Sequence, residues 1–208
     1  MNQIQSHILK IGLMLALFAI VATSLVSLTE INTRDQIKEN ERQALLAALN
    51  ELVDTSRYDN DILEDKLSLP ALADLHTKSP TYIYRARKGN TPIAAVFTSI
   101  APNGYNGKIK LLVGIYFDGS LAGVRVIQQK ETPGLGDKID LKKSDWILGF
   151  KGLSLQNPTE SRWKVKKDGG DFDQFTGATI TPRAVVAAVK NALVYFEQHR
   201  DELFEETE

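Results

Sequence analysis

Threonine hydroxyls and a glycine come together near the C-terminus, where residues 173–179 read Asp-Gln-Phe-Thr-Gly-Ala-Thr. Gly177 is free to adopt a backbone conformation closed to other residues and lets a ligand approach closely. Thr181 is a favoured N-cap residue and Pro182 a favoured first helical residue, so a helix is predicted to begin here. Because a helix N-terminus favours a nearby phosphate group, a threonine in this segment could carry a phosphoester. A plain Thr-Gly turn before a helix is the alternative, since short motifs often match by chance.

Two further segments combine glycines with polar residues. Residues 131–138 read Glu-Thr-Pro-Gly-Leu-Gly-Asp-Lys, and residues 104–107 read Gly-Tyr-Asn-Gly. In the first, Pro133 fixes one backbone dihedral while glycines free its neighbours, so the loop could lie flat against a planar ring and offer it backbone N–H groups. A structural turn between a strand and a helix explains these residues equally well. The second segment falls between two predicted strands, where a plain turn is also expected.

The composition excludes several kinds of chemistry. The formal net charge is −1 and there is no cysteine, so no general attraction to nucleic acid is expected, and disulfides, iron–sulfur clusters and cysteine-attached haem are excluded. The histidines lack ligand-like spacing, and Asp168, Asp171 and Asp173 lack the spacing of a calcium loop, so no metal site is predicted. No nucleophile–histidine–acid set, Walker loop or dinucleotide fingerprint is present. The chain is therefore not expected to oxidise NADH itself.

An apolar, uncharged stretch near the N-terminus predicts a membrane anchor. Residues 11–28 are about long enough to cross the hydrocarbon core as a helix, at roughly 1.5 Å per residue. We interpret residues 1–10 as a tail and residues 11–29 as a transmembrane helix. A cleaved signal peptide is the alternative, with a weak cleavage site at residues 22–24. The continuation of the apolar run beyond that site favours an uncleaved anchor.

The rest of the chain divides into a linker and one soluble domain. Residues 30–80 are interpreted as a helical linker region and residues 81–208 as a single domain. Within the linker, apolar residues at helical period predict a helix over about 33–53. Thr33 has capping-box spacing to Gln36, which could mark its start. The stretch is interpreted as a helix that continues from the membrane and packs on the domain or a partner subunit, or as one that simply packs on the protein's own core.

The domain is predicted to be α+β, with an antiparallel sheet and flanking helices. Alternating residues between 81 and 129, with an Asp-Gly hairpin signal at residues 118–119, predict an antiparallel meander. Ser144 is predicted to cap a short helix, and residues 162–166 are predicted to form a strand. A final amphipathic helix is predicted over about 182–203, with one face in the core.

The first segment resembles the flavinylation motif of FMN-binding domains, Asp-x-x-(Ser/Thr)-Gly-Ala-Thr. In that family the last threonine is joined to FMN through the flavin's phosphate, and a dedicated flavin transferase makes the bond. The resemblance therefore implies covalent FMN on Thr179. It makes Thr176 the Ser/Thr position and Asp173 the acidic residue, with Gly177 and Ala178 between Thr176 and Thr179.

The resemblance also extends to the upstream glycine segment. It makes Thr132, Gly134 and Leu135 candidate flavin contacts. The three segments in this order, behind one membrane span, resemble the G subunits of the Rnf electron transport complex. This family resemblance covers nearly the whole chain.

Such a resemblance implies a function in electron transfer. It implies a membrane-anchored flavoprotein that relays electrons through covalent FMN, in a complex that couples electron transfer between ferredoxin and NADH to ion translocation. The chain would be a non-autonomous subunit of that oxidoreductase. Its expected partners are the other membrane subunits, the flavin transferase and membrane lipid, but not nucleic acid.

The resemblance further implies a bacterial inner-membrane protein with a short cytoplasmic N-terminus and a periplasmic domain. Basic residues alone do not place the N-terminus inside, because Lys10 precedes the span while Arg34, Lys38 and Arg42 follow it. Three alternatives stay open. They are the C subunit of a sodium-pumping NADH:quinone reductase, which is similar but usually longer, a flavin-bearing sensor or regulatory module, and a membrane-anchored binding module without cofactor.

Overall fold

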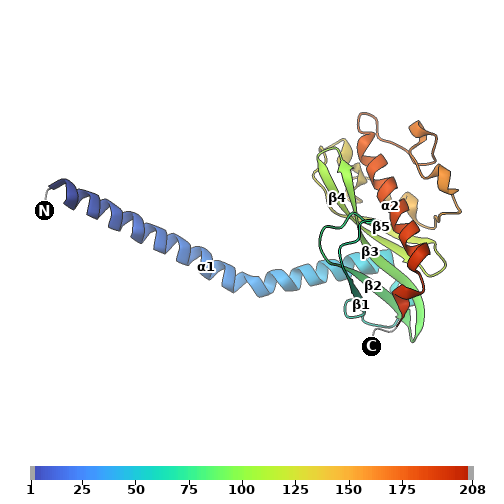
Figure 1. Cartoon of the computed structure of the whole chain (residues 1–208), viewed down its shortest axis with the longest axis horizontal. Coiled ribbons are helices and arrows are strands. Elements are labelled where there is room, and N and C mark those ends of the chain that lie inside the picture. Colours follow the sequence, from blue (N-terminus) through green and yellow to red (C-terminus); the bar gives the residue numbers. More distant parts are fainter. Residues whose placement is uncertain (1–2, 206–208) are drawn as a thin grey trace. The chain divides into compact units, whose positions relative to one another are not determined.

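The computed structural model describes residues 3–205, and it contains a long N-terminal helix and an α+β domain (Figure 1). The helices are α1 (Gln3–Leu52) and α2 (Ile180–His199). The strands are β1 (Lys66–Leu69), β2 (Thr81–Lys88), β3 (Thr91–Gly104), β4 (Gly107–Tyr116) and β5 (Leu121–Gln128). They form one five-stranded sheet in chain order, and every neighbouring pair is antiparallel. The predicted α+β class and antiparallel meander are confirmed.

Short 3₁₀ helices make up much of the remaining chain. They are η1 (Thr55–Arg57), η2 (Gly136–Ile139), η3 (Asp145–Phe150), η4 (Glu160–Arg162), η5 (Lys166–Asp168) and η6 (Glu202–Phe204). Ser144 caps η3 as predicted, because its hydroxyl accepts a hydrogen bond from the Trp146 amide at 3.1 Å. The strand predicted over 162–166 is wrong. Arg162 donates to the Gly169 carbonyl at 2.9 Å, which closes this segment on itself away from the sheet.

The first helix runs without interruption through the apolar stretch and beyond it. A helix start at Thr33 is wrong, because its hydroxyl donates to the Thr29 carbonyl one turn earlier at 2.8 Å. The predicted continuation of the helix from the apolar stretch agrees with α1. No glycine or proline occurs in residues 13–52 to break the helix. Among residues 3–205, α1 is the one helix long and apolar enough to cross a membrane. The large apolar side chains between Ile4 and Ile37 are exposed, and Phe18 is 73% exposed.

The second compact unit begins at Leu46, so it includes residues that were interpreted as linker. These residues include the buried last turn of α1 and the strand β1, which was not predicted. This short strand pairs with β2, so that Leu67 lies opposite Ile83. The final helix also ends earlier than predicted, at His199, and is followed by η6.

One face of the sheet packs against α2 (Figure 1). The Phe97 ring of β3 meets the rings of Tyr195 and Phe196 edge-on, with centroid distances of 6.1 and 6.0 Å. Ser99, on the same face, donates to the Ala188 carbonyl at 3.1 Å. The predicted core stripe of α2 is confirmed, since each of its residues is buried: Val185, Val189, Ala192, Leu193 and Phe196.

The last turn of α1 covers part of the opposite face. Leu52 is 3% exposed and lies over Gly114 of β4 and Gly123 of β5. A Cβ atom at Gly123 would lie 3.2 Å from Leu52 Cδ2, so the glycines leave room for this leucine. Arg125 of β5 pairs with Glu51 at 3.0 Å and holds the same turn in place.

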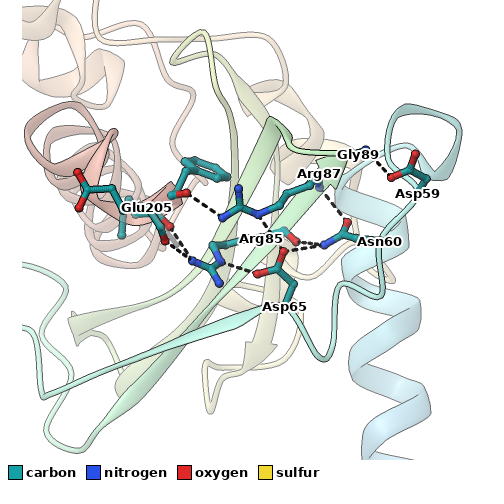
Figure 2. A network of polar contacts seen from close by, with 9 residues as sticks. Asp59, Asn60, Asp65, Arg85, Arg87, Gly89 and Glu205 are labelled. Carbon is teal, nitrogen blue, oxygen red and sulfur yellow. Dashed lines mark hydrogen bonds and ion pairs between the residues drawn. The ribbon is translucent and has the colours of Figure 1, made fainter. Parts of the chain in front are cut away.

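Two arginines of β2 join the segment before β1 to the C-terminal turn (Figure 2). The Asp65 carboxylate accepts from Arg85 Nε at 2.6 Å and from Arg87 Nε at 2.9 Å. The same guanidinium groups donate to the backbone carbonyls of Glu205 at 3.2 Å and Phe204 at 2.9 Å. One carboxylate and these carbonyl oxygens therefore balance two cations that are largely buried.

Replacing Asp65 with asparagine should destabilise the domain. The change keeps the side-chain shape but leaves two arginines, 10% and 13% exposed, without their anion. Because the site is partly exposed, we expect a loss of about 2 kcal/mol, below the cost for a fully buried pair. The melting temperature followed by circular dichroism should fall by roughly 4–8 °C. An equal fall in the exposed control Asp145→Asn would contradict this role of Asp65.

Candidate functional site

A cavity of about 220 Å³ lies where three segments of the soluble unit meet. The segments are the tip of the β3–β4 hairpin, the loop after β5 and the start of α2. Its lining residues are Tyr105, Glu131, Thr132, Leu135, Gly136, Gly177, Ala178, Thr179, Ile180 and Thr181. The fold thus brings together the three glycine-containing segments that are far apart in the sequence.

The carboxylate of Glu131 joins these segments. Glu131 is only 4% exposed. It accepts hydrogen bonds from the backbone amides of Tyr105 at 3.2 Å and Asn106 at 3.0 Å, and the Thr181 hydroxyl donates to its Oε2 atom. A buried anion needs such donors to offset its lost hydration. The hairpin tip, the loop and the helix start are therefore held around one charge.

Two glycines leave the space that this carboxylate occupies. A Cβ atom at Gly136 would lie 2.7 Å from Thr181 Oγ1 and 3.0 Å from Glu131 Oε2. A Cβ atom at Gly104 would lie 2.3 Å from the Gly107 carbonyl oxygen and 3.0 Å from Glu131 Oε1. Gly134 differs, because a Cβ atom there would have nothing within 4 Å, while its φ angle is +77°. Glycine is needed at Gly134 for its backbone conformation.

The start of α2 differs from the prediction. The helix begins at Ile180 with Thr179 as its N-cap residue, so Thr181 and Pro182 lie inside the first turn. Thr181 lies one residue past the helix start, and its hydroxyl donates to Glu131. Pro182 costs no hydrogen bond, since first-turn amides lack acceptors within the helix. The Thr179 side chain makes no capping hydrogen bond and lines the cavity.

Most of the predicted site residues lie at this cavity. It is lined by Thr132, Leu135, Gly177, Ala178 and Thr179. Gly177 has a φ angle of +79°, a positive value that glycine adopts readily.

The other predicted residues do not line the cavity. Gly134 and Thr176 are exposed next to lining residues. Asp173 is also exposed, and its carboxylate pairs with Lys166 Nζ at 2.6 Å. These three residues belong to the same loops but offer no side chain to the cavity.

Several lining residues were not predicted as site residues. Tyr105, Glu131 and Gly136 stood in the glycine segments, and Glu131 was noted only as a source of polar atoms in its loop. Ile180 carried no signal at all. The cavity has an apolar rim formed by three exposed side chains. Tyr105 is 65% exposed, Leu135 43% and Ile180 45%.

The aspartates before the helix each face a basic side chain. Asp168 pairs with Arg183, Asp171 with Arg162, and Asp173 with Lys166. The hydrogen bond from Arg183 lowers the pKa of the Asp168 carboxyl, so this group is anionic at neutral pH. No group of three metal-ligating side chains occurs within the described part of the chain, residues 3–205.

Comparisons with known proteins match both parts of the chain. A family model described as "FMN-binding domain" matches residues 104–194, a range that contains all three cavity segments. A second, described as "RnfG N-terminal region", matches residues 1–52.

Curated relatives match nearly the full length. The chain is 52% identical to the G subunit of the ion-translocating oxidoreductase complex of Pseudoalteromonas atlantica, over 95% of this chain and 92% of that protein. It is 50% identical to the protein of the same name from Vibrio parahaemolyticus, over 93% and 92% of the two chains. It is 47% identical to that from Shewanella baltica, over 96% and 94%.

Removing the Glu131 carboxylate should loosen the hairpin tip. In Glu131→Ala the amides of Tyr105 and Asn106 lose their acceptor, and we expect their hydrogen exchange to accelerate by at least about tenfold. Exchange measured by mass spectrometry on peptides that cover the hairpin tip checks this. The exposed control Glu64→Ala should leave these peptides unchanged. Equal exchange in the wild type and Glu131→Ala would show that the carboxylate does not hold the tip.

Proposed function

We propose a function from the premise that this chain belongs to the family of G subunits of ion-translocating oxidoreductase complexes. The chain is the flavoprotein subunit of such a complex and takes part in its electron transfer. The observation that supports this proposal most directly is the cavity, because its three segments all lie within the residues that match the FMN-binding domain. The subunit works as one part of the oxidoreductase and not as an autonomous enzyme, and the complex couples electron transfer between ferredoxin and NADH to ion movement.

The residues around the cavity fit FMN. The first amides of α2 lack acceptors within the helix and carry partial positive charge, which suits a phosphate group. The exposed parts of Leu135 and Ile180 offer apolar surface for a flat ring. At about 220 Å³ the cavity is smaller than sites that enclose a drug-sized ligand, typically about 300–1,000 Å³. A bound FMN would therefore keep part of its ring at the surface, where a partner could reach it.

Thr179 is the proposed attachment residue, through an ester between its hydroxyl and the flavin's phosphate. It lines the cavity, stands at the helix N-terminus and makes no capping hydrogen bond. The neighbouring threonines are less suited. Thr181 is fully buried, with its hydroxyl bonded to Glu131. Thr176 is exposed and does not line the cavity. The exposed Asp173 is available to the flavin transferase that would form the ester.

The chain's own residues would bind FMN and orient it, and the bound FMN would supply the transfer of one or two electrons. With no cysteine, the chain carries no iron–sulfur cluster of its own. A covalent tether suits a domain on the periplasmic side of the inner membrane, because a released FMN would be lost there. α1 is the proposed anchor in membrane lipid, and the other membrane subunits are the partners that exchange electrons with the site.

Replacing Thr179 with valine should abolish covalent flavin while the domain still folds. The change keeps the side-chain shape but removes the oxygen that would form the ester. The protein is co-expressed with the flavin transferase, and flavin fluorescence is read in the denatured protein band. Thr176→Ser is the matched control and should retain the fluorescence.

Mass spectrometry locates the ester. The tryptic peptide 168–183 contains Thr176, Thr179 and Thr181, so its fragmentation spectrum distinguishes them. The added mass of one esterified FMN is expected on Thr179. Covalent flavin that persists in Thr179→Val, or added mass on Thr176 or Thr181, would contradict the assignment.

The orientation of the chain in the membrane can be tested with single introduced cysteines, because the chain has no native cysteine. A single cysteine at the exposed Lys151 should react with a membrane-impermeant maleimide in intact spheroplasts. A single cysteine at Gln3 should react only after the membrane is permeabilised. The reverse pattern would place the domain in the cytoplasm.

A further inference from the structure

A second and larger hollow, about 700 Å³, lies on the sheet face opposite α2. Side chains alternate between the faces of a strand. Ile83 of β2 packs in the core with α2, so its neighbours Tyr82 and Tyr84 point to the other face and line the hollow. The last turn of α1 covers one part of this face, over Gly114. The hollow lies on the part of this face that α1 does not cover.

Lysines give this hollow a positive charge, and we call it the lysine groove. Lys78, Lys108 and Lys110 line it, and no aspartate or glutamate does. The Lys66 ammonium lies 5.7 Å from the ring centre of Tyr82 and adds a further cation. None of the ion pairs formed within residues 3–205 involves these lysines. The whole chain has a net charge of only −1, so this is a local concentration of cations.

The wall of the groove is preformed. Ala73 and residues 76–80, between β1 and β2, make this wall. Thr77 closes the wall on itself, because its hydroxyl accepts from the Leu72 amide at 2.7 Å. The Ile100 amide of β3 donates to the Leu75 carbonyl at 3.0 Å and fixes the wall to the sheet. A preformed surface loses little conformational freedom when it binds a partner.

One wall residue has an unusual backbone. His76 has a φ angle of +53° and is the one non-glycine residue with positive φ in residues 3–205. Strained residues of this kind cluster at sites that clamp ligands. Tyr82, on the floor, is 48% exposed. A tyrosine with one apolar face and one polar end is a common anchor at protein interfaces.

The groove adjoins the candidate flavin site through one hairpin. Pro102 of β3 and Lys108 of β4 line the groove. Tyr105, at the tip between them, lines the smaller cavity. Anything seated in the groove therefore lies against the hairpin that forms one wall of the flavin site.

We propose that the lysine groove is a docking surface for an extended acidic segment of another protein subunit. The volume exceeds what a single phosphate ion would fill, and a hollow with a fixed wall does not match a flat membrane surface. Its cations are complementary to carboxylates, and such complementarity steers and orients partners. That the partner is a subunit of the oxidoreductase complex rests on the proposed function, whereas the binding chemistry does not.

Charge reversal in the groove tests the proposal in the intact complex. The triple variant Lys78→Glu, Lys108→Glu, Lys110→Glu is expressed with all other subunits, and the complex is purified through a tag on one of them. We expect the amount of this chain in the purified complex to fall by at least about tenfold, because like charges then face each other. The variant with arginine at the same three positions keeps the positive charge, so this chain should remain in the purified complex at the wild-type level.

A matched control carries the same change in charge elsewhere on the domain: Lys88→Glu, Lys151→Glu and Lys164→Glu. It should remain in the complex at the wild-type level. Covalent flavin fluorescence is measured in both variants and should be unchanged, so a defect in flavin attachment is distinguished from a defect in docking. Equal retention of the groove variant and the control would overturn the proposal.

A cross-link identifies the occupant even if the triple variant fails to fold. Benzoylphenylalanine replaces Tyr82 in the otherwise native chain, and the complex is irradiated in membranes. We expect the cross-linked peptide to be an aspartate- and glutamate-rich segment of another subunit. A cross-link confined to phospholipid, to a second copy of this chain, or to a segment without acidic residues would overturn the proposal.

Discussion

The buried carboxylate of Glu131 is the interaction on which the arrangement of the candidate site depends. It gathers donors from the hairpin tip and from the start of α2, and no side chain larger than hydrogen fits beside it at Gly136. Thr181 donates its hydroxyl to this anion from inside the first turn of α2. The helix starts at Ile180, and Thr179 stands at the cavity with its hydroxyl uncommitted. Removing one partner from such a network leaves buried polar groups unpaired, which costs more than the bond itself contributed.

The antiparallel sheet separates two roles. One face packs against α2 and carries the hydrophobic core, so the first turn of α2 is fixed at the cavity. The other face is shared between the last turn of α1 and the lysine groove. The β3–β4 hairpin belongs to both sides, since Lys108 lines the groove and Tyr105 lines the cavity. A partner bound on one face would thus lie next to a flavin held at the edge of the other, as an electron relay between subunits requires.

The sequence predicted the elements whose signals are local. The Asp-Gly turn and period-two alternation identified the β4–β5 hairpin, and the apolar stripe identified α2. β1 was missed because four residues carry little periodicity, and its stability comes from pairing with β2. The role of Glu131 was missed for a similar reason, since its partners lie 25 to 50 residues away in the sequence. The motif resemblance brought attention to the loops that line the cavity, but burial and hydrogen bonding decide which side chains meet.

The most direct test of the account is an experimental structure of the chain after flavin attachment. The account predicts density that continues from Thr179 Oγ1 into a phosphate at the start of α2, with the flavin ring against Leu135 and Ile180. It also predicts that Glu131 keeps its hydrogen bonds to the hairpin tip. A flavin joined to another residue, or a ring lying away from this cavity, would contradict the central claim that three segments held by one buried carboxylate form the flavin site.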